Sequence, residues 1–364
     1  MSKAPLTSFA ITEPTDSAFM SCLYGATYAL ARVDISSLAG ISRPAISEAA
    51  VRLQARGAIL STGVRQGTRG GVATLFKINP DYCRSLAVSI ESDRLQLRST
   101  AADGSIIDSR VHPIAEMTTT EEAIEQAARL VDVSIASAKS PISAISISAA
   151  NPVDLESGMI VDFHELASHA ARFDAKAIFS RDDASLTIDN DVNWATIAES
   201  AEDIHGRDFV YIFIGRGIGA GLFLEGGLRR GNRGLAGEIG RLRIDSSHDL
   251  TTRLAALGLG NIEEHKLSVA SEPVSARLSA SDYRQVVRVL AEQMANLAIS
   301  LDPARFALSG PFANDPKFFS DLTTAFKSLS LVEIDIDHAQ FDPLGGASQH
   351  AHQETLRLIG VNRP

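Results

Sequence analysis

The sequence predicts an α/β protein that begins with a winged helix-turn-helix. Three observations support this fold class. The first 80 residues contain two helical segments around a glycine turn, followed by two short strands around a Gly-rich loop. From about residue 84, strands and helices alternate toward the C-terminus. The length of 364 residues and the hydrophobic content of 45% suit two or three domains, each with its own core.

The helices of the first domain are predicted from apolar spacing and from helix-end signals. Residues 15–31 carry Phe, Leu and Ala at helical spacing. A short helix near 35–39 is followed by a glycine turn. Ser42 then stands as the N-cap of a second helix, whose first turn accepts Pro44. That helix ends at Gly57, because glycine is favoured just beyond a helix C-terminus.

Two short strands follow, at 58–61 and 73–78, and we expect them to form a hairpin. The loop between them is rich in glycine, carries Arg65 and Arg69, and contains no acidic residue. A hairpin with a basic tip is typical of a wing. The dipeptide Asn79–Pro80 punctuates its end. We therefore predict a first domain at 1–80 and a second domain at 81–364.

The charge of the chain is unevenly distributed. The net charge is −10, which by itself argues against a nucleic-acid partner. Residues 1–80 nevertheless hold eight basic and four acidic residues, whereas the remainder holds 26 basic and 40 acidic residues. A basic head on an acidic body suits a DNA-binding module attached to a larger solvated domain. Chance fluctuation explains so small an excess equally well, so the asymmetry needs the support of a motif.

A helix-turn-helix places the start of its second helix in the major groove of DNA. The candidate DNA contacts are Ser42, Arg43, Pro44, Ser47, Arg52, Arg65 and Arg69. Arg43, Pro44 and Ser47 would face base edges. Ser42 and Arg52 are better placed for phosphates, and the two wing arginines would enter a minor groove or contact the backbone. A plain helical hairpin is the alternative, and the basic wing directly downstream argues against it.

The second domain alternates strands and helices without a short internal repeat. Strands are predicted at 86–90, 95–99, 142–148, 185–188, 209–214, 305–309 and 331–336, and helices at 119–138, 164–181, 193–201 and 282–300. The stretch 164–181 is mostly helical in its pattern. This alternation is typical of an α/β domain.

Two stretches of the second domain carry a family resemblance. They are IDNDVNWATIAE at 188–199 and IGRGIGAGLFLEGGLRRGNRGLAGEIGR at 214–241. Together they closely resemble the ROK family of repressors, open reading frames and sugar kinases. The helix-turn-helix, the glycine-bearing wing and the Asn79–Pro80 dipeptide resemble the repressor branch. The resemblance spans about residues 18–360.

This resemblance implies an actin-like, two-lobed ATPase or kinase fold with a sugar bound in the interlobe cleft. Asn190, Asp191 and Glu238 would then hydrogen-bond sugar hydroxyls, since amides and carboxylates suit vicinal hydroxyl groups. In the kinase branch, the aspartate matching Asp191 is the general base that deprotonates the acceptor hydroxyl. Asp191 also suits a helix N-cap, and the two roles can coexist.

Three nucleotide-contact elements of the family are degraded in this chain. The stretch 87–97 has no glycine where the family has a glycine-rich phosphate turn. The Gly-Thr-Gly turn is Gly215-Arg216-Gly217, and a late Gly-Gly pair is reduced to one glycine in 308–312. Phosphoryl transfer depends on positioning and on charge neutralisation. We therefore expect no catalytic activity and no cofactor.

The zinc cluster of the family is also absent from the sequence. Arg241 occupies the position of the family's zinc-binding histidine, and no cysteine follows Cys83, so we predict no metal site. His248 is expected to be an ordinary surface residue, and 242–260 to be held by packing alone. Arg241 would pair with a carboxylate or phosphate on the ligand, which favours an anionic sugar derivative. The alternative for Arg241 is a salt bridge with Glu238 or Asp245.

The combined prediction is a DNA-binding transcriptional regulator, a repressor of carbohydrate metabolism genes that responds to a bound sugar or sugar derivative. Its expected partners are double-stranded operator DNA, that ligand, and further copies of itself in a homodimer or a dimer of dimers. Two cysteines and the lack of a long apolar run suggest a cytoplasmic protein with no membrane partner. An active ATP-dependent sugar kinase with an extra DNA-binding head is the alternative. A DNA-binding or scaffold protein with a vestigial ligand site is a third possibility.

Overall fold

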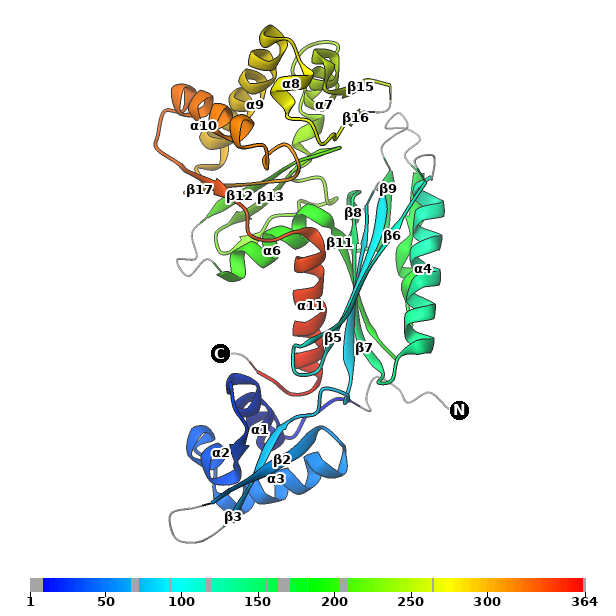
Figure 1. Cartoon of the computed structure of the whole chain (residues 1–364), viewed down its shortest axis with the longest axis vertical. Coiled ribbons are helices and arrows are strands. Elements are labelled where there is room, and N and C mark those ends of the chain that lie inside the picture. The colour runs from blue at the N-terminus through cyan, green and yellow to red at the C-terminus, as the bar shows by residue number, and fades with distance from the viewer. Residues whose placement is uncertain are drawn as a thin grey trace. The chain divides into compact units, whose positions relative to one another are not determined.

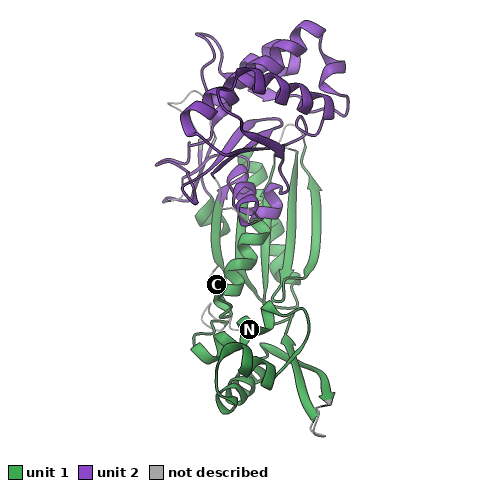
Figure 2. Ribbon diagram, turned by 90° about the vertical axis from the view of Figure 1, so that its left-hand side faces the viewer, with its two compact units in different colours: residues 1–147, 175–188, 347–364 green, residues 148–174, 189–346 purple. Residues whose placement is uncertain are grey.

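A computed structural model describes residues 9–66, 72–91, 93–115, 119–154, 156–162, 171–181, 183–202, 208–263 and 265–362. The chain forms two compact units, coloured separately in Figure 2. Unit 1 comprises Met1–Ile147, Ala175–Ile188 and Ala347–Pro364, and unit 2 comprises Ser148–Asp174 and Asp189–Gly346. Within the described part of the chain, no helix is long and apolar enough to cross a membrane.

The N-terminal head belongs to unit 1. It contains the helices α1 (Pro14–Gly25), α2 (Arg32–Ala39) and α3 (Arg43–Ala55), and the strands β1 (Leu30–Ala31), β2 (Ile59–Gln66) and β3 (Val72–Ile78) (Figure 1). The strands form one sheet in the order β1-β3-β2. Gly40 ends α2 in the left-handed conformation, with φ of 67°, as the glycine turn predicts. Pro44 lies in the first turn of α3.

The predicted helix at 15–31 is too long. Helix α1 ends at Gly25, and Leu30 pairs with Phe76 of β3 in the antiparallel strand β1. Leu30 is nevertheless buried in the same core as Phe19 and Phe76. The side chain of Leu30 therefore fits the helical spacing of apolar residues, which made the predicted helix too long. Its backbone belongs to a strand.

The head packs on the C-terminal end of the chain within unit 1. The head core includes Leu356, Ile359 and Val361. The Ile11 amide donates to the Leu358 carbonyl at 2.9 Å. The head and the C-terminal segment thus share one hydrophobic core, and the boundary at Asn79–Pro80 stays a prediction.

The rest of unit 1 is a sheet between two helices. Its strand order is β11-β7-β4-β5-β6, formed by Ser185–Asn190, Ile142–Ala149, Arg84–Ile90, Arg94–Ala101 and Ile106–Pro113. Helix α4 (Thr120–Ser137) lies on one face and α11 (Pro343–Leu358) on the other (Figure 1). Small hydroxyl side chains let α11 approach, since Ser143 of β7 hydrogen-bonds Thr355 at 2.9 Å and Thr100 of β5 contacts Ser348 at 3.3 Å. Short α5 (Ala175–Phe179) also belongs to this unit.

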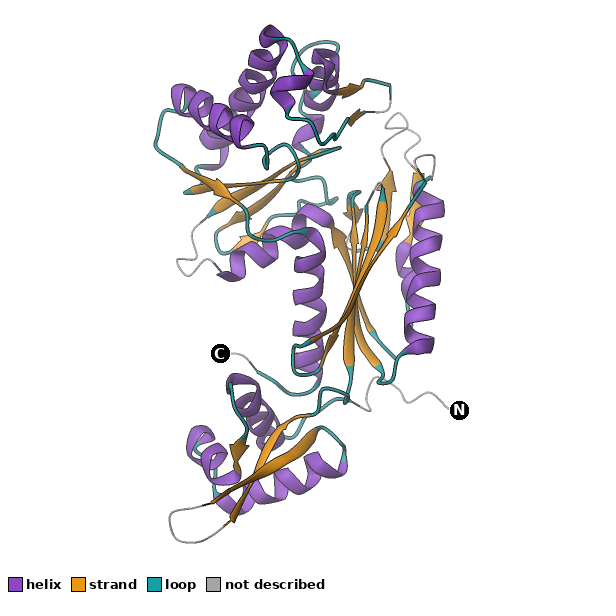
Figure 3. Cartoon of the chain, in the orientation of Figure 1, coloured by secondary structure: helices purple, strands orange, loops and turns teal. Residues whose placement is uncertain are grey.

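Unit 2 has a second five-stranded sheet, in the order β14-β13-β12-β17-β18 (Figure 3). These strands are Gly227–Leu228, Ile218–Leu224, Phe209–Ile214, Arg305–Ser309 and Asp335–His338. The main helices are α6 (Asp191–Glu202), α9 (Ala280–Leu301) and α10 (Pro316–Leu329), and the shorter ones are α7 (Leu250–Leu254) and α8 (Val274–Arg277). One small sheet consists of β8 (Val153–Asp154), β9 (Met159–Asp162) and β10 (Ala171–Asp174). Another consists of β15 (Gly260–Asn261) and β16 (Lys266–Leu267).

Two predicted elements of the second domain are wrong in their bounds. Residues 171–174, predicted as helix, form β10, because they pair antiparallel with β9. The predicted late strand at 331–336 begins only at Asp335, where β18 pairs in parallel with β17. Leu331 lies before it and is 83% exposed, so its apolar character does not indicate a strand. The first part of the predicted helix, 164–170, lies outside the described residues.

Candidate functional site

The end of β11 and the start of α6 form a polar junction inside unit 2. Asp189 is almost fully buried, and its Oδ1 accepts hydrogen bonds from the Asn193 side chain and from the Asn190 amide, both at 2.8 Å. Arg230 donates from Nε to Asp189 Oδ2 at 2.6 Å. A buried carboxylate requires such partners, so the charge of Asp189 is compensated locally and the junction is rigidly built.

Asn190 and Asp191 follow directly. Asn190 Oδ1 accepts from the amides of Val192 and Asn193, at 3.0 and 3.3 Å, which makes Asn190 the N-cap of α6. Asp191 is the first residue of the helix, and its Oδ1 accepts from the Val192 amide at 2.7 Å. A carboxylate in the first turn is favoured by the helix dipole. The backbone-capping role proposed for Asp191 is thus shared with Asn190.

Glycines hold the loop that joins β14 to the short 3-10 helix Ile239–Arg241. Gly237 has φ of 94°, and a Cβ there would lie 1.8 Å from the Ala220 carbonyl oxygen. That contact is close because the Gly237 carbonyl accepts from the Ala220 amide at 2.7 Å. At Gly234, with φ of 70°, a Cβ would lie 2.3 Å from the Val153 carbonyl oxygen. Only glycine fits either position, so the path of the loop is fixed.

Glu238 ends this loop and is half-buried. Within the described residues its carboxylate makes no hydrogen bond and no ion pair. Burial raises the pKa of Glu238 to about 7, although the positive charge of Arg241 acts in the opposite direction. A poorly solvated carboxylate without a protein partner is suited to bond ligand hydroxyl groups.

Arg241 pairs with neither of the carboxylates expected for it. Its Nη1 lies 3.8 Å from Asp249 Oδ2, and the same oxygen contacts His265 Nε2 at 2.8 Å. Asp249 Oδ1 also caps α7 through the Thr252 amide at 2.8 Å. Burial opposes ionisation of Asp249, but the hydrogen bonds from Thr252 and His265 hold its pKa below the usual range.

The expectation that 242–260 is held by packing alone is therefore wrong. The Asp249 contacts fasten this segment in addition to its buried leucines. Among the described residues the donor set does not fit zinc, because Arg241 stands beside the Asp249 carboxylate and His265 is the one histidine that reaches it. His248, predicted to be a surface residue, lies 3.1 Å from Asp245 Oδ1.

The turn between β4 and β5 is the place of the degraded phosphate contact. The Glu91 amide donates to the Arg94 carbonyl at 3.0 Å, which closes the turn. The Glu91 carboxylate pairs with Arg94 at 2.8 Å and accepts from Gln96. Ion-paired and hydrogen-bonded side chains thus stand where the family has a glycine-rich phosphate turn, and the loss of nucleotide binding stays a prediction.

The structure brings the four predicted ligand residues, Asn190, Asp191, Glu238 and Arg241, into unit 2. It also pairs Asp189 with Arg230 in the same unit, two residues that are 41 positions apart in the sequence and were not among the predicted site residues. The motif at 188–199 contained Asp189, but nothing in the sequence indicated its arginine partner. Trp194 of α6 is 1% exposed and is a core residue.

The predicted DNA contacts lie on the head. Ser42, Arg43 and Pro44 are exposed at the start of α3, and Ser47 is half-buried one turn later. Two of the predicted arginines carry ion pairs. Arg52 Nη2 lies 2.6 Å from the buried Asp16, and Arg65 Nη2 lies 2.9 Å from Asp34. Arg69 lies outside the described residues.

Residues 86–253 match the ROK family profile. They contain the β11–α6 junction, the glycine-held loop and Glu238. The chain contains a ROK family domain.

Known proteins similar to this chain include kinases and repressors. The beta-glucoside kinase of Listeria innocua is 26% identical over 249 residues, which cover 59% of this chain and 81% of the kinase. The xylose repressor of Caldicellulosiruptor bescii is 22% identical over 226 residues, which cover 61% of this chain and 56% of the repressor. The ROK domain alone therefore does not distinguish the two classes.

A similar solved structure extends over nearly the whole chain. It is the crystal structure of a ROK family transcriptional regulator, a homologue of the MLC protein of E. coli. It has a TM-score of 0.63 and 15% sequence identity, and the match covers 98% of this chain and 99% of that one. At this identity the likeness establishes the fold, including a head attached to the ROK domain.

Proposed function

We propose that this protein is a DNA-binding transcriptional regulator, a repressor of carbohydrate metabolism genes that responds to a sugar or sugar derivative. The observation that carries the proposal is the head itself. It joins the exposed start of α3 to a ROK domain, and the solved regulator is similar over 98% of the chain. The head is interpreted as a winged helix-turn-helix, with α2 and α3 as the motif and the β2–β3 hairpin as the wing.

Arg43 is the residue on which DNA reading is expected to depend. It is exposed at the first position of α3, and the described residues offer it neither a hydrogen bond nor an ion pair. Arginine at the N-terminal end of a recognition helix suits the acceptor edge of guanine. Arg52 differs, because it compensates the buried Asp16. Its predicted phosphate contact would use a guanidinium that also holds α1 against α3.

A DNA selection experiment tests this proposal. Duplexes with a random central segment are selected on the full-length protein, and binding of the enriched sequence is measured by fluorescence anisotropy. We expect Arg43→Ala to weaken binding by about 1–3 kcal/mol and to relax sequence preference at one position. Arg288→Ala is the matched control, since Arg288 is 75% exposed on α9 of unit 2. Failure to enrich any sequence would contradict the DNA-binding function.

Sugar sensing is assigned to the residues gathered in unit 2. Glu238 offers a half-buried acceptor, while Asn190 and Asp191 stand at the start of α6. Thermal-shift measurements against sugars and ATP test this part. A ligand at 100 times its Kd should stabilise the fold by about 2.7 kcal/mol. A shift with a sugar but not with ATP is the expected result.

The sugar kinase is the second candidate, and Asp191 and the similarity to the beta-glucoside kinase favour it. The β4–β5 turn argues against it, because the stretch 87–97 has no glycine and carries the Glu91–Arg94 ion pair where a phosphate turn is expected. Stabilisation by micromolar ATP, with phosphorylation of a sugar, would replace the regulator by the kinase.

Helix α11 offers a route for coupling sugar to DNA. Gly346 of this helix belongs to unit 2 and lies against α6. A Cβ added at Gly346 would lie only 2.0 Å from the Trp194 carbonyl oxygen. Residue 352 of α11 belongs to unit 1, where the His352 Nε2 hydrogen-bonds the Tyr24 hydroxyl of α1 at 3.1 Å. One continuous helix therefore contacts both the element that begins with Asp191 and the DNA-binding head. Such coupling changes the affinities for sugar and DNA reciprocally.

The proposed working form is a homodimer or a dimer of dimers. A two-fold dimer would present two α3 helices to half-sites about one DNA turn apart. An operator with two related half-sites would support this form, and a single half-site bound by one chain would contradict it.

A further inference from the structure

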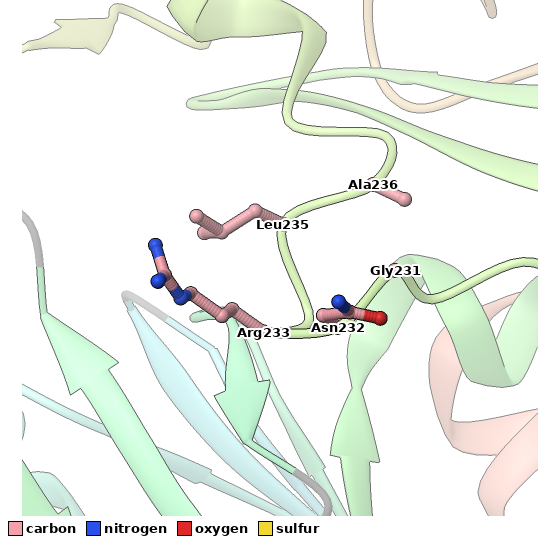
Figure 4. Close-up of a pocket in the computed structure, with 5 residues that line it drawn as sticks. All are labelled: Gly231, Asn232, Arg233, Leu235 and Ala236. Carbon is pink, nitrogen blue, oxygen red and sulfur yellow. The ribbon is translucent and has the colours of Figure 1, made fainter.

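The loop between β14 and the 3-10 helix borders a pocket. The pocket is lined by Gly231, Asn232, Arg233, Leu235 and Ala236 (Figure 4). The Arg233 and Leu235 side chains extend on the same side of the loop in this view. A cation and an apolar side chain thus lie together at one pocket, which is the mixed lining that polar organic ligands require.

The arginines around this loop differ in how their charges are compensated. Arg229 pairs with Glu225, Arg230 with Asp189 at 2.6 Å, and Arg241 approaches Asp249 at 3.8 Å. Arg233 has neither a hydrogen bond nor an ion pair with any residue that the structure describes. The pocket-lining arginine is therefore the one in this set whose guanidinium is available to a ligand.

Glycines with positive φ stand on both sides of Arg233. Gly231 and Gly234 have φ of 69° and 70°, and Gly234 lies against the Val153 carbonyl. The close approach at Gly234 thus sets the backbone next to Arg233 on its C-terminal side.

The same loop is connected to the predicted sugar-binding residues. Arg230, three positions before Arg233, holds Asp189 directly beside Asn190 and Asp191. Glu238 ends the loop five positions after Arg233. The pocket is therefore built on the segment that joins the two groups of predicted ligand contacts in unit 2.

We propose that Arg233 binds the anionic group of the ligand, and that the ligand is an anionic sugar derivative bearing a carboxylate or a phosphate. This inference rests on the proposed sugar-sensing function and deepens it. A guanidinium forms paired hydrogen bonds with either anion, whereas a neutral sugar offers no such partner. Leu235 and Ala236 would contact the apolar face of the sugar ring. The anion-binding role expected of Arg241 thus passes to Arg233, since Arg241 lies beside Asp249.

Calorimetry with matched probes tests the inference on the full-length protein. The probes are the neutral hexose, the uronic acid and the 6-phosphate of the glucose, galactose and mannose series. We expect one anionic member to bind at least about tenfold more tightly than its neutral parent, because one charged bidentate contact is worth that factor or more. The uronic acid and the phosphate arms identify which anion is recognised.

Two variants locate the effect. Arg233→Ala should remove the preference for the anion while leaving any binding of the neutral sugar unchanged. Arg229→Ala is the matched control, since Arg229 lies on the same loop but is paired with Glu225, and it should keep the preference. Arg233→Lys keeps the charge without the fork and should retain only part of the preference. It also serves if the alanine variant does not fold.

The outcomes separate this inference from the proposed function. Equal binding of neutral and anionic sugars, or a preference that survives Arg233→Ala, would overturn the role of Arg233 and leave the sugar sensor intact. Binding of no sugar of any kind would overturn both.

Discussion

Glu238 combines burial with the lack of a side-chain partner among the described residues, and its pKa therefore differs between the folded and unfolded states. Its pKa is about 7 in the folded protein, above the ordinary value of 4.5. Between these values the folded state binds more protons than the unfolded state. Stability contributed by the protonated form is thus complete below about pH 4.5 and decreases as the pH rises toward 7.

This linkage predicts the behaviour of Glu238→Gln, which resembles the protonated form. The variant should match the native protein near pH 4 and should exceed it in unfolding free energy by up to about 3 kcal/mol at pH 8. Urea unfolding of the ligand-free protein across this range measures the difference. Parallel pH profiles for the two proteins would contradict a raised pKa. Gain of stability with loss of sugar binding would identify Glu238 as a residue kept for its ligand.

Other single residues have more than one role. Arg52, expected to contact phosphates, neutralises the buried Asp16 and so joins α1 to α3. Arg65 pairs with Asp34 on α2 and lowers the pKa of that carboxyl through their hydrogen bond. Contact between either arginine and DNA would require sharing or exchange of these partners. Arg43 carries no such competition within the described residues, which makes it the cleaner probe of DNA binding.

At the scale of elements, α11 is shared by several parts of the chain. It packs on the sheet of unit 1 through Thr355 and Ser348, and its end joins the head core through Leu356. A helix that contacts both the sheet and the head core transmits displacement as a rigid body, because packed interiors resist local deformation. The contact between Tyr24 and His352 is where α11 meets α1.

Tyr24→Phe tests this contact, since it removes the hydroxyl and keeps the ring. We expect a loss of about 1 kcal/mol in unfolding stability, the usual net value of a hydrogen bond. We also expect a smaller effect of sugar on DNA affinity. Anisotropy titrations with and without the bound sugar measure that effect. Tyr28→Phe is the control, because Tyr28 is 65% exposed in the same head. Identical coupling in both variants would exclude this contact from signal transmission.

The loop from Arg229 to Glu238 is the corresponding element of unit 2. Its course depends on Gly234 and Gly237, which lie against backbone carbonyls of other strands. Near the start of the loop, Arg230 pairs with Asp189. At its end, Glu238 has a carboxylate that can accept hydrogen bonds from a ligand. This arrangement separates the residues that build the loop from those that can meet a ligand.

At the scale of the whole molecule, the uneven charge gives a further prediction. The head region is basic and the remainder acidic, so binding to DNA should depend on a small number of phosphate contacts and be sensitive to salt. With about four contacts, affinity should fall about a hundredfold between 50 and 200 mM salt. Anisotropy titrations over that range measure the slope. A slope near zero would contradict phosphate contacts by the head.

The ROK domain is compatible with both a kinase and a regulator, so the assignment depends on the rest of the chain. The head adds the surface proposed to bind DNA, and the β4–β5 turn lacks the glycines expected of a phosphate-binding turn. These two features lie in different segments and support the same proposal independently. The thermal-shift measurement with ATP tests the β4–β5 turn independently of the head.

Much of the fold could be predicted from local sequence signals. Gly40 and Pro44 indicated where α2 ends and α3 begins, because each restricts the backbone by itself. The motifs at 188–199 and 214–241 were sufficient to indicate the family. Strand β1 and the bounds of β10 and β18 could not be predicted, because pairing with distant strands decides them.

The sequence by itself determined most of the order of elements, the family and the candidate residues Asn190, Asp191, Glu238 and Arg241. Only the tertiary structure decided how their charges are partnered. Asp189 with Arg230 and Arg241 with Asp249 are neighbours in space, and no local pattern encodes such pairs. The physical reason is that hydrogen bonds and ion pairs act over a few ångströms, whereas their partners here come from separate segments that the fold alone brings together.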